Sequence, residues 1–411
     1  MKIQRIGLEK INGPLVYIKT PKDASFEEQV ELVLPSGEIR LGNVITLSED
    51  ATVIQVYEGT NGMNSKGIKT EFTGKPLKLK LSKEMLGRIF DGAGRPIDGL
   101  MTLIRGQKLP IFSGSGINHN KLAEKIIRQA NIKDDSNFAI VFGLIGAEYE
   151  TAEFFRKSFE ENGILEKVVT FQNLSNDPSI ERILTPKVAL TCAEYLAFEL
   201  DMQVLVILTD MTAYAEALRE VSTLKGEIPS RKGYPGYLYS DFASIYERAG
   251  KIRGKKGSIT QIPILTMPND DISHPIPDIT GYITEGQIVL SRDLSQKGIN
   301  PPINILDSLS RLMKDGIGEK FTRADHREIA DQLFTSYSKV QDVRALAKVL
   351  GESDLSETDK KYLEFGEAFE NKWLNQDTLE SRTIEQTLDL AWEILKILPE
   401  SEWSKLNVSK K

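Results

Sequence analysis

The sequence predicts a mixed, three-part fold with an N-terminal β-barrel, a central α/β domain and a C-terminal α-helical domain. Short alternating segments with Gly and Pro turns fill the N-terminal part. Continuous Val/Ile/Leu runs alternate with helical segments in the middle. Aromatic residues recur at helical spacing near the C-terminus. With 411 residues, the chain is too long for one hydrophobic core.

Residues 1–75 are predicted to form the β-barrel. Apolar and polar side chains alternate in Val30–Leu32 and again in Ile39–Leu41, and Pro35–Gly37 supplies a turn between them. Short strands joined by such turns favour a small closed barrel.

Residues 76–345 are predicted to form the α/β domain. The runs Phe138–Phe142 and Val168–Phe171 are mainly apolar, which is typical of strands buried on both faces of a parallel sheet. Helical segments follow them, around Thr151–Phe159 and around Pro186–Leu200.

Residues 346–411 are predicted to be helical and are acidic. Tyr362, Phe365, Phe369 and Trp373 fall on one face of a helix. We interpret this aromatic stripe as part of a hydrophobic core and not as a ligand site.

Residues Gln107–Ala130 have the outline of a phosphate-binding loop. Gln107–Phe112 is predicted to be a short strand, Ser113–Gly116 a tight turn and Lys121–Ala130 a helix. A working loop ends in Gly-Lys-Ser/Thr, because the lysine neutralises the phosphates and the hydroxyl holds Mg²⁺. The residues that follow Gly116 are instead Ile117, Asn118, His119 and Asn120. This degenerate P-loop predicts a subunit that assists a catalytic partner.

Acidic residues at two places along the chain could carry chemistry, and each place has a structural alternative. Asp210 follows the apolar run Val204–Leu208, where nucleoside triphosphatases place a carboxylate that supports Mg²⁺. The same residue could equally be the N-cap of the next helix. Glu148 and Glu150 could polarise an attacking water, but we prefer to interpret them as first-turn carboxylates favoured by the helix dipole.

Arg311 lies in the string Ser308–Gly316, after a proline-rich loop. An arginine at such a loop can point across an interface into a neighbour's active site, where its planar guanidinium stabilises charge on phosphoryl oxygens. The alternative is a surface ion-pair residue.

Composition limits the other classes of function. The net charge of −7 argues against nucleic acid as the main partner. The single cysteine, Cys192, excludes an intrachain disulfide and is predicted to be buried. The three histidines lack metal-ligand spacing, so no metal site is predicted. The sequence shows no signal peptide or membrane span, so any membrane association is expected to be indirect.

Several longer strings resemble the B subunit of the A-type/V-type rotary ATPases, over nearly the whole chain. They are Arg105–Gly116, Thr209–Thr212 with Tyr214–Glu220, Gly233–Tyr237, Thr260–Pro268, His274–Asp278 with Gly281–Gln287, and Ser308–Met313. The resemblance implies a β-barrel, a RecA-like α/β domain of the P-loop NTPase type and a helical domain. It also implies an A3B3 ring in which B subunits alternate with catalytic A subunits, with central and peripheral stalks, on the cytoplasmic face of a membrane.

The same resemblance implies roles for individual residues. Arg311 is expected to reach, in trans, the ATP or ADP with Mg²⁺ that is held mainly by the A subunit. Ser310, Tyr282, Gly114 and Gly116 are the other candidate nucleotide contacts. The ring would couple ATP synthesis or hydrolysis to proton or sodium transport.

The chain departs from the family pattern in two places. It is shortened between Gly92–Gly99 and Leu100–Ile104, where one Ile-Asp-Gly serves for two. After Gly318 it has Glu319–Arg323, where relatives often have Gly-Lys-Thr-Arg.

Two other functions stay open. One is a self-sufficient RecA-like NTPase that uses Lys121 in place of the missing lysine. The other is a purely architectural ring spacer without nucleotide contact.

Overall fold

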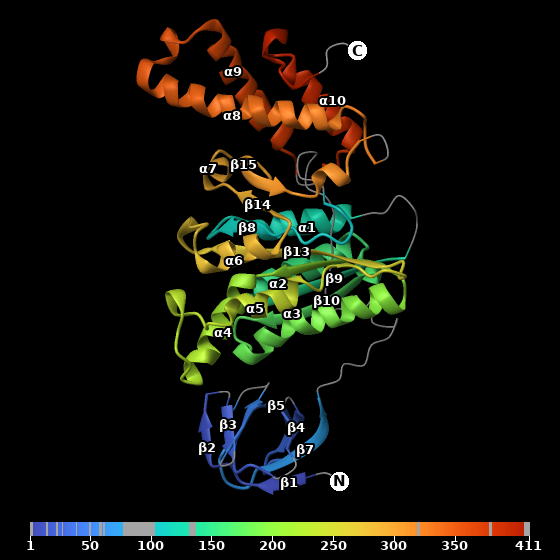
Figure 1. The fold of residues 1–411 in the computed structure, drawn as a ribbon, viewed down its shortest axis with the longest axis vertical. Coiled ribbons are helices and arrows are strands. Elements are labelled where there is room, and N and C mark those ends of the chain that lie inside the picture. Colours follow the sequence, from blue (N-terminus) through green and yellow to red (C-terminus); the bar gives the residue numbers. More distant parts are fainter. Residues whose placement is uncertain are drawn as a thin grey trace.

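The computed structural model describes residues 3–13, 15–21, 24–26, 28–37, 39–48, 51–56, 60, 62–76, 103–130, 137–318, 321–377 and 380–406. They form an elongated molecule with three parts along its long axis (Figure 1). A β-sheet lies at one end, an α/β domain in the middle and a group of helices at the other end. The three-part fold predicted from the sequence is confirmed.

The N-terminal part is a curved antiparallel sheet of seven strands, in the order β1-β7-β4-β5-β6-β3-β2. The described strands trace a half-barrel (Figure 1). They are β1 (Ile3–Ile6), β2 (Lys10–Asn12), β3 (Leu15–Ile18), β4 (Glu28–Val33), β5 (Ile39–Leu47), β6 (Thr52–Val56) and β7 (Lys69–Pro76). Side chains along β4 and β6 are alternately buried and partly exposed. Val30 and Ile54 point into a hydrophobic core that belongs to the N-terminal part alone.

The central domain is built on a sheet in the order β10-β9-β11-β13-β8-β14-β15. Its strands are parallel from β10 to β14, and β15 pairs antiparallel with β14. The strands are β8 (Ile111–Gly114), β9 (Phe138–Ala147), β10 (Val168–Leu174), β11 (Gln203–Thr209), β12 (Gly250–Lys251), β13 (Ser258–Met267), β14 (Gly286–Leu290) and β15 (Ile303–Ser310). The short β12 pairs with β13.

Helices cover both faces of this sheet (Figure 1). They are α1 (His119–Gln129), α2 (Tyr149–Glu161), α3 (Ser179–Glu194), α4 (Met211–Leu224), α5 (Leu238–Tyr246), α6 (Pro275–Ile283) and α7 (Arg292–Gln296). Side chains of α1 and α2, such as Ile126 and Phe155, share one hydrophobic core with one set of strand residues. Side chains of α3, α4, α5 and α6 share a second core with the opposite set.

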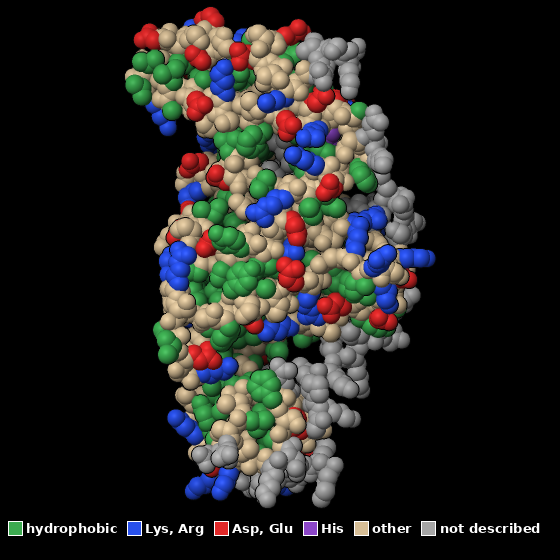
Figure 2. Space-filling view, in the orientation of Figure 1, with side chains coloured by type: hydrophobic (Ala, Val, Ile, Leu, Met, Phe, Trp, Pro, Cys, Tyr) green, Lys and Arg blue, Asp and Glu red, His purple; other side chains and the backbone are tan. Residues whose placement is uncertain are grey.

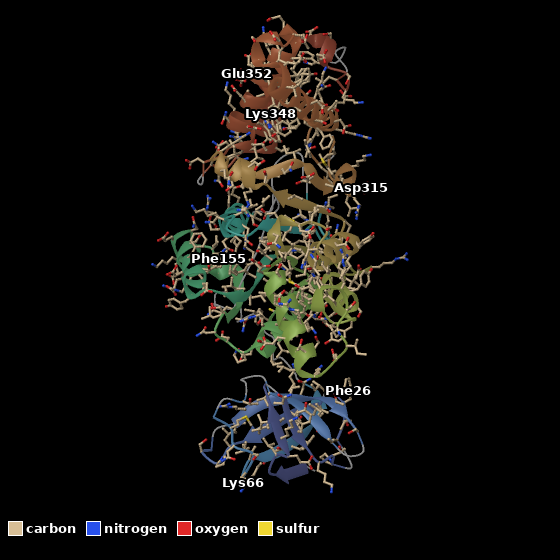
Figure 3. All side chains as sticks on the ribbon, turned by 90° about the vertical axis from the view of Figure 1, so that its left-hand side faces the viewer. Phe26, Lys66, Phe155, Asp315, Lys348 and Glu352 are labelled. Carbon is tan, nitrogen blue, oxygen red and sulfur yellow. The ribbon has the colours of Figure 1, made fainter. Side chains whose placement is uncertain are left out.

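The C-terminal part contains α8 (His326–Leu350), α9 (Glu357–Ala368) and α10 (Ile384–Leu395). The four aromatic residues of the predicted stripe are at most 2% exposed, which confirms that they belong to a core. This core is continuous with the one that α1 and α2 form on the sheet. Figure 3 shows Phe26 and Lys66 on the N-terminal sheet, far from Lys348 and Glu352 on the helical part.

The predicted domain boundary after residue 345 stays a prediction, and it falls within α8. The predicted boundary after residue 75 lies near the end of β7, and residues 77–102, which include the shortened stretch, are outside the described part of the chain. Cys192 is buried, as predicted.

Some element boundaries in the central domain differ from the sequence prediction. The strand before the degenerate loop is not Gln107–Phe112 but begins at Ile111, because Pro110 has no N–H to donate to a neighbouring strand. The helix predicted near Pro186 begins at Ser179, with Pro178 as its N-cap residue, so Pro186 lies inside the helix.

Candidate functional site

The degenerate loop joins β8 to α1 at the carboxyl edge of the parallel sheet. Helix α1 begins at His119 and not at Lys121, because the Asn118 side chain accepts a hydrogen bond of 3.1 Å from the Lys121 backbone N–H. Lys121 is exposed on the first turn of α1. One amide at this helix terminus is thus capped by the protein's own side chain.

An ion pair occupies the mouth of the loop. The Asp270 carboxylate lies 2.6 Å from the Arg292 guanidinium, which also donates a 2.8 Å hydrogen bond to the Ser115 carbonyl. A Cβ atom placed on Gly114 would lie 2.1 Å from Asp270 Oδ1. The hydrogen bond from Arg292 holds the pKa of Asp270 below its ordinary value, so the carboxylate is charged at neutral pH. The two charges at the mouth of this loop are therefore already paired with each other.

Asp210 is the N-cap of α4, the structural alternative noted above. Its carboxylate accepts a 2.7 Å hydrogen bond from the Thr212 backbone N–H. It also accepts hydrogen bonds from the backbone N–H and the hydroxyl of Thr266. These contacts tie β11 to β13 and leave the carboxylate already engaged.

His119, the first residue of α1, lies beside the loop. Its Nδ1 lies 3.2 Å from the Ser113 hydroxyl. Burial lowers the pKa of the imidazole, an effect that the Asp210 carboxylate partly offsets. His119 is therefore neutral at pH 7 and gives the loop no positive charge.

Of the two glutamates at the start of α2, one lies in the first turn, as expected, and the other directly precedes the helix. Glu148 is the N-cap residue of α2 and accepts a 3.1 Å hydrogen bond from the Ser175 hydroxyl. Glu150 lies in the first turn of α2. The position of Glu150 agrees with the first-turn interpretation, whereas Glu148 lies one residue before the first turn.

Arg311 follows β15 directly and is exposed. Its backbone N–H donates to the Glu285 carbonyl at 2.9 Å, and its guanidinium Nη1 donates to the Thr284 carbonyl at 2.8 Å. Within the described part of the chain, no carboxylate forms an ion pair with this guanidinium. Arg311 is therefore held by its backbone N–H and by one guanidinium N–H, and its other guanidinium N–H groups remain for another molecule.

An open hollow of about 260 Å³ borders Arg311. Tyr282, from the last turn of α6, lines the same hollow and is 77% exposed. A second hollow, between β15 and α8, borders the other side of Arg311. Figure 3 places Asp315, from the turn after β15, at the side of the molecule near the helical domain.

The structure separates the predicted site residues into two groups. Arg311 and Tyr282 share the open hollow, because α6 runs directly into the link that holds Arg311. Ser310 is buried beside them and accepts a 3.1 Å hydrogen bond from the Gln107 amide. Gly114 and Gly116 belong instead to the degenerate loop.

Sequence reasoning missed the ion pair of Asp270 and Arg292. Both residues are far from the loop in sequence, and neither lies in a phosphate-binding motif. The only signal along the chain is that each lies close to a string with a family resemblance.

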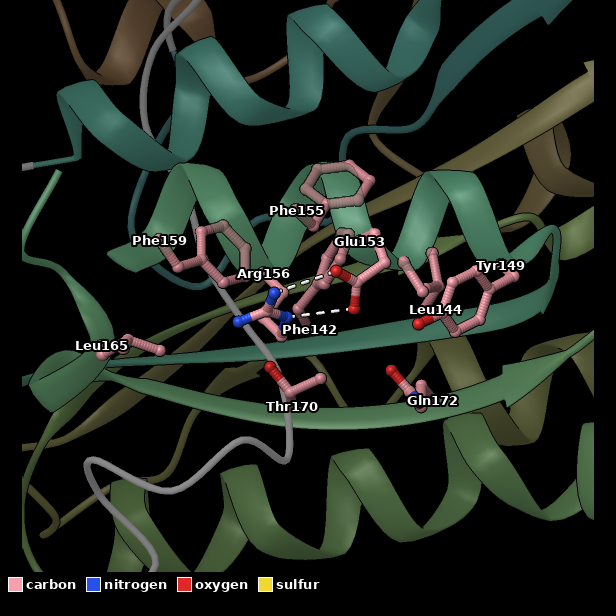
Figure 4. A pocket seen from close by; sticks show the side chains of 11 residues that line it. Phe142, Leu144, Tyr149, Glu153, Phe155, Arg156, Phe159, Leu165, Thr170 and Gln172 are labelled. Atoms are coloured by element: carbon pink, nitrogen blue, oxygen red, sulfur yellow. Dashed lines mark hydrogen bonds and ion pairs between the residues drawn. The ribbon is translucent and has the colours of Figure 1, made fainter. Parts of the chain in front are cut away.

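A further small hollow lies between α2 and the strands β9 and β10 (Figure 4). Phe142, Phe155 and Phe159 form its apolar wall. The one arginine in its lining, Arg156, is paired with Glu153 at 2.9 Å and with Glu160 at 2.6 Å. With its cation already neutralised, this hollow does not suit a phosphate group.

Lys/Arg and Asp/Glu side chains are interspersed on the face seen in Figure 2. This face shows no continuous basic stripe of the kind that follows a nucleic-acid backbone. No described helix has the length and apolar character that crossing a membrane requires.

The fold and the site together define a nucleotide-binding type of α/β protein whose own phosphate loop is degenerate. The chain belongs to the ATP synthase alpha/beta family. Residues 94–310 match its nucleotide-binding domain, and residues 9–74 match its beta-barrel domain. Residues 315–411 match the C-terminal domain of V and A type ATP synthase.

The similar proteins bear names from the V- and A-type branch. The V-type ATP synthase beta chain 2 of Clostridium tetani is 54% identical and covers 99% of this chain and 97% of its own length. The B subunit of the A-type ATP synthase of Nitrosopumilus maritimus is 53% identical over 98% of this chain and 96% of its own length. This confirms the resemblance to the B subunit.

A solved structure shares the fold. It is described as a unique ATP synthase subunit, NeqB, from Nanoarcheaum equitans, with 38% identity and a TM-score of 0.72 over 93% of this chain and 98% of that one.

The alignment with the Clostridium tetani protein spans 448 positions, more than the 411 residues of this chain. The relative therefore contains residues without a counterpart here, which agrees with the shortening inferred from the sequence.

Proposed function

We propose that this chain is the non-catalytic, regulatory B subunit of a rotary ATP synthase or ATPase of the A/V type. It alternates with catalytic A subunits in an A3B3 ring and supplies Arg311 to the nucleotide site of its neighbour. Central and peripheral stalk subunits are its further partners. The complex couples ATP synthesis or hydrolysis to proton or sodium transport, and this chain lies on the cytoplasmic face of the membrane as a peripheral component.

The observation that carries the proposal is the contrast between the two groups of site residues. At the chain's own loop, the Arg292 guanidinium is already paired with the Asp270 carboxylate, and the motif lysine is missing. Arg311, by contrast, is exposed, anchored on two backbone carbonyls and open to a hollow. The guanidinium at the chain's own loop is thus paired, whereas the exposed Arg311 has no carboxylate partner among the described residues.

The residues around Arg311 fit a phosphate-bearing group that a neighbour presents with its Mg²⁺. A guanidinium donates paired, planar hydrogen bonds to phosphoryl oxygens and stabilises the charge that develops on them. Tyr282 provides an exposed aromatic ring in the same hollow. Ser310 contributes indirectly. Its buried hydroxyl accepts a hydrogen bond from Gln107 and so holds the backbone next to Arg311.

The test is ATP turnover by a ring reconstituted from this chain and its catalytic partner. Arg311→Ala should lower turnover by roughly 10³–10⁵-fold, the effect expected of an arginine supplied in trans. Arg311→Lys should recover little, because an ammonium cannot make the paired contacts. Wild-type turnover in an assembled Arg311→Ala ring would reject the role and favour an architectural spacer.

The self-sufficient NTPase is tested with the purified chain alone. We expect no ATP hydrolysis above background, because Lys121 lies on the first turn of α1, beyond the position directly after Gly116 where a working loop has its lysine. Hydrolysis that disappears in Lys121→Ala would establish that alternative.

A further inference from the structure

The two carbonyls that hold Arg311 belong to a link of two residues, Thr284 and Glu285, between α6 and β14. Gly286, which begins β14, pairs with Ser310, which ends β15. A Cβ atom on Gly286 would lie only 2.0 Å from the Leu309 carbonyl oxygen, and its φ is +141°. The link and the end of β15 are therefore in close backbone contact, so any shift of the link moves Arg311.

Lys108 holds this link through three hydrogen bonds to Glu285. The Lys108 backbone N–H donates to Glu285 Oε2 at 2.8 Å, and its ammonium donates to Oε1 at 2.6 Å. In return, the Glu285 backbone N–H donates to the Lys108 carbonyl at 3.1 Å. The Lys108 side chain is 9% exposed and that of Glu285 27%, so water competes poorly for this pair.

The residue before Lys108 holds the other side of Arg311. The Gln107 side chain, 1% exposed, donates to the Ser310 hydroxyl at 3.1 Å and accepts from the Ile104 backbone N–H at 3.0 Å. Gln107 and Lys108 thus reach both backbone segments from which Arg311 projects. They belong to the segment that leads into β8 and the degenerate loop.

We propose that Lys108 and Glu285 are positioning residues for Arg311. The inference rests on the proposed function. Gln107 and Lys108 precede the degenerate loop. In this chain they hold the backbone segments that position the Arg311 guanidinium, which serves a neighbouring subunit. Neither residue touches the nucleotide; both act through Arg311.

Glu247 provides a matched control. Its carboxylate lies 3.5 Å from the same Lys108 ammonium, but it is 62% exposed and belongs to the C-cap of α5, away from the Arg311 link. Removing the charge of Glu247 removes one ion pair of Lys108 but leaves the hydrogen bonds between Lys108 and Glu285 in place.

The experiment measures ATP turnover of the reconstituted ring for Glu285→Gln, Lys108→Met and Glu247→Gln, with assembly checked by size-exclusion chromatography. We expect Glu285→Gln and Lys108→Met to lower kcat about 10- to 100-fold, the effect of a displacement near 1 Å, with KM changed less than about twofold. Lys108→Arg should restore more activity than Lys108→Met, and Glu247→Gln should stay within about twofold of wild type.

The same changes in the Arg311→Ala background separate this proposal from the proposed function. If Lys108 and Glu285 act through Arg311, Glu285→Gln should lower the residual turnover less than about twofold there. An unchanged kcat in Glu285→Gln, or an equal loss in both backgrounds, would overturn the positioning role while Arg311 keeps its own. Failure of Glu285→Gln to assemble would also overturn it, because Glu285 would then be needed for folding. Full turnover in Arg311→Ala would overturn the proposed function itself.

Discussion

The Asp270 carboxylate lies where a side chain on residue 114 would have to go, 2.1 Å from the Cβ position of Gly114. Arg292 fixes the carboxylate there and also bonds the Ser115 carbonyl. The glycine of the degenerate loop therefore serves an internal ion pair. In a loop that binds phosphate, the same small residue would allow the backbone to approach the ligand.

Gly114→Ala should destabilise the protein by about 1–3 kcal/mol, because the new methyl group overlaps Asp270 Oδ1 and forces the ion pair to move. Gly236→Ala is the control, since nothing lies within 4 Å of its Cβ position and its φ is not positive. Urea unfolding followed by circular dichroism measures both. Equal stability of Gly114→Ala and wild type would contradict the close contact.

Glu370→Gln should destabilise the helical domain by about 1.5–3 kcal/mol at pH 7, because the buried carboxylate accepts hydrogen bonds from Arg344, Tyr337 and Lys297. Tryptophan fluorescence is a suitable readout, since all three tryptophans of the chain, Trp373, Trp392 and Trp403, lie in the C-terminal part. Glu357→Gln, at an exposed carboxylate paired with a neighbouring lysine on α9, should leave the stability close to that of wild type.

The effect of Glu370→Gln should also depend on pH. Burial raises the pKa of Glu370, but its hydrogen bonds outweigh burial, and the pKa lies below its ordinary value. The stabilisation is then complete above the unfolded pKa and is lost as the pH falls through the lower, folded value. The difference between Glu370→Gln and wild type should therefore shrink below about pH 4. A constant difference from pH 7 to pH 3 would contradict this.

Phe369→Ala should cost about 3–5 kcal/mol, because the ring is fully buried and packs between Tyr337, 4.6 Å away, and Trp373, 5.2 Å away. Phe321→Ala, at a side chain that is 60% exposed, should cost less than about 0.5 kcal/mol. Thermal unfolding monitored by tryptophan fluorescence compares the two. Similar midpoints would show that the aromatic stripe is not a core.

Because the pKa of the buried His119 is lowered, we expect the protein to lose stability at mildly acidic pH. Its folded pKa is lowered by burial, so the unfolded chain binds a proton first as the pH falls below about 6.5. His119→Gln cannot take up that proton, and its unfolding midpoint should fall less between pH 7 and pH 5.5 than that of wild type. Parallel curves for the two proteins would rule out His119 as the titrating group. His274, whose pKa is also lowered by burial, contributes equally to both proteins.

The spacing of apolar residues along the chain predicted which faces of the helices are buried. The aromatic stripe from Tyr362 to Trp373 has helical spacing and is buried as expected, because burial of a helix face follows from the spacing itself. Asp210 shows the limit of such patterns. A strand-terminal aspartate suits both a metal site and a helix cap. The structure shows that the carboxylate caps α4 and is also bonded to Thr266, on another strand.

The sequence by itself determined the three-part fold, the missing cation of the loop and the family, because these depend on residue types and their local order. Tertiary structure alone decided what fills the loop and what holds Arg311. Asp270 and Arg292 meet at Gly114, and Lys108 meets Glu285, across long separations in sequence. Such contacts depend on how strands and helices come together in space. Neither the spacing of residues along the chain nor its composition shows which distant residues will meet.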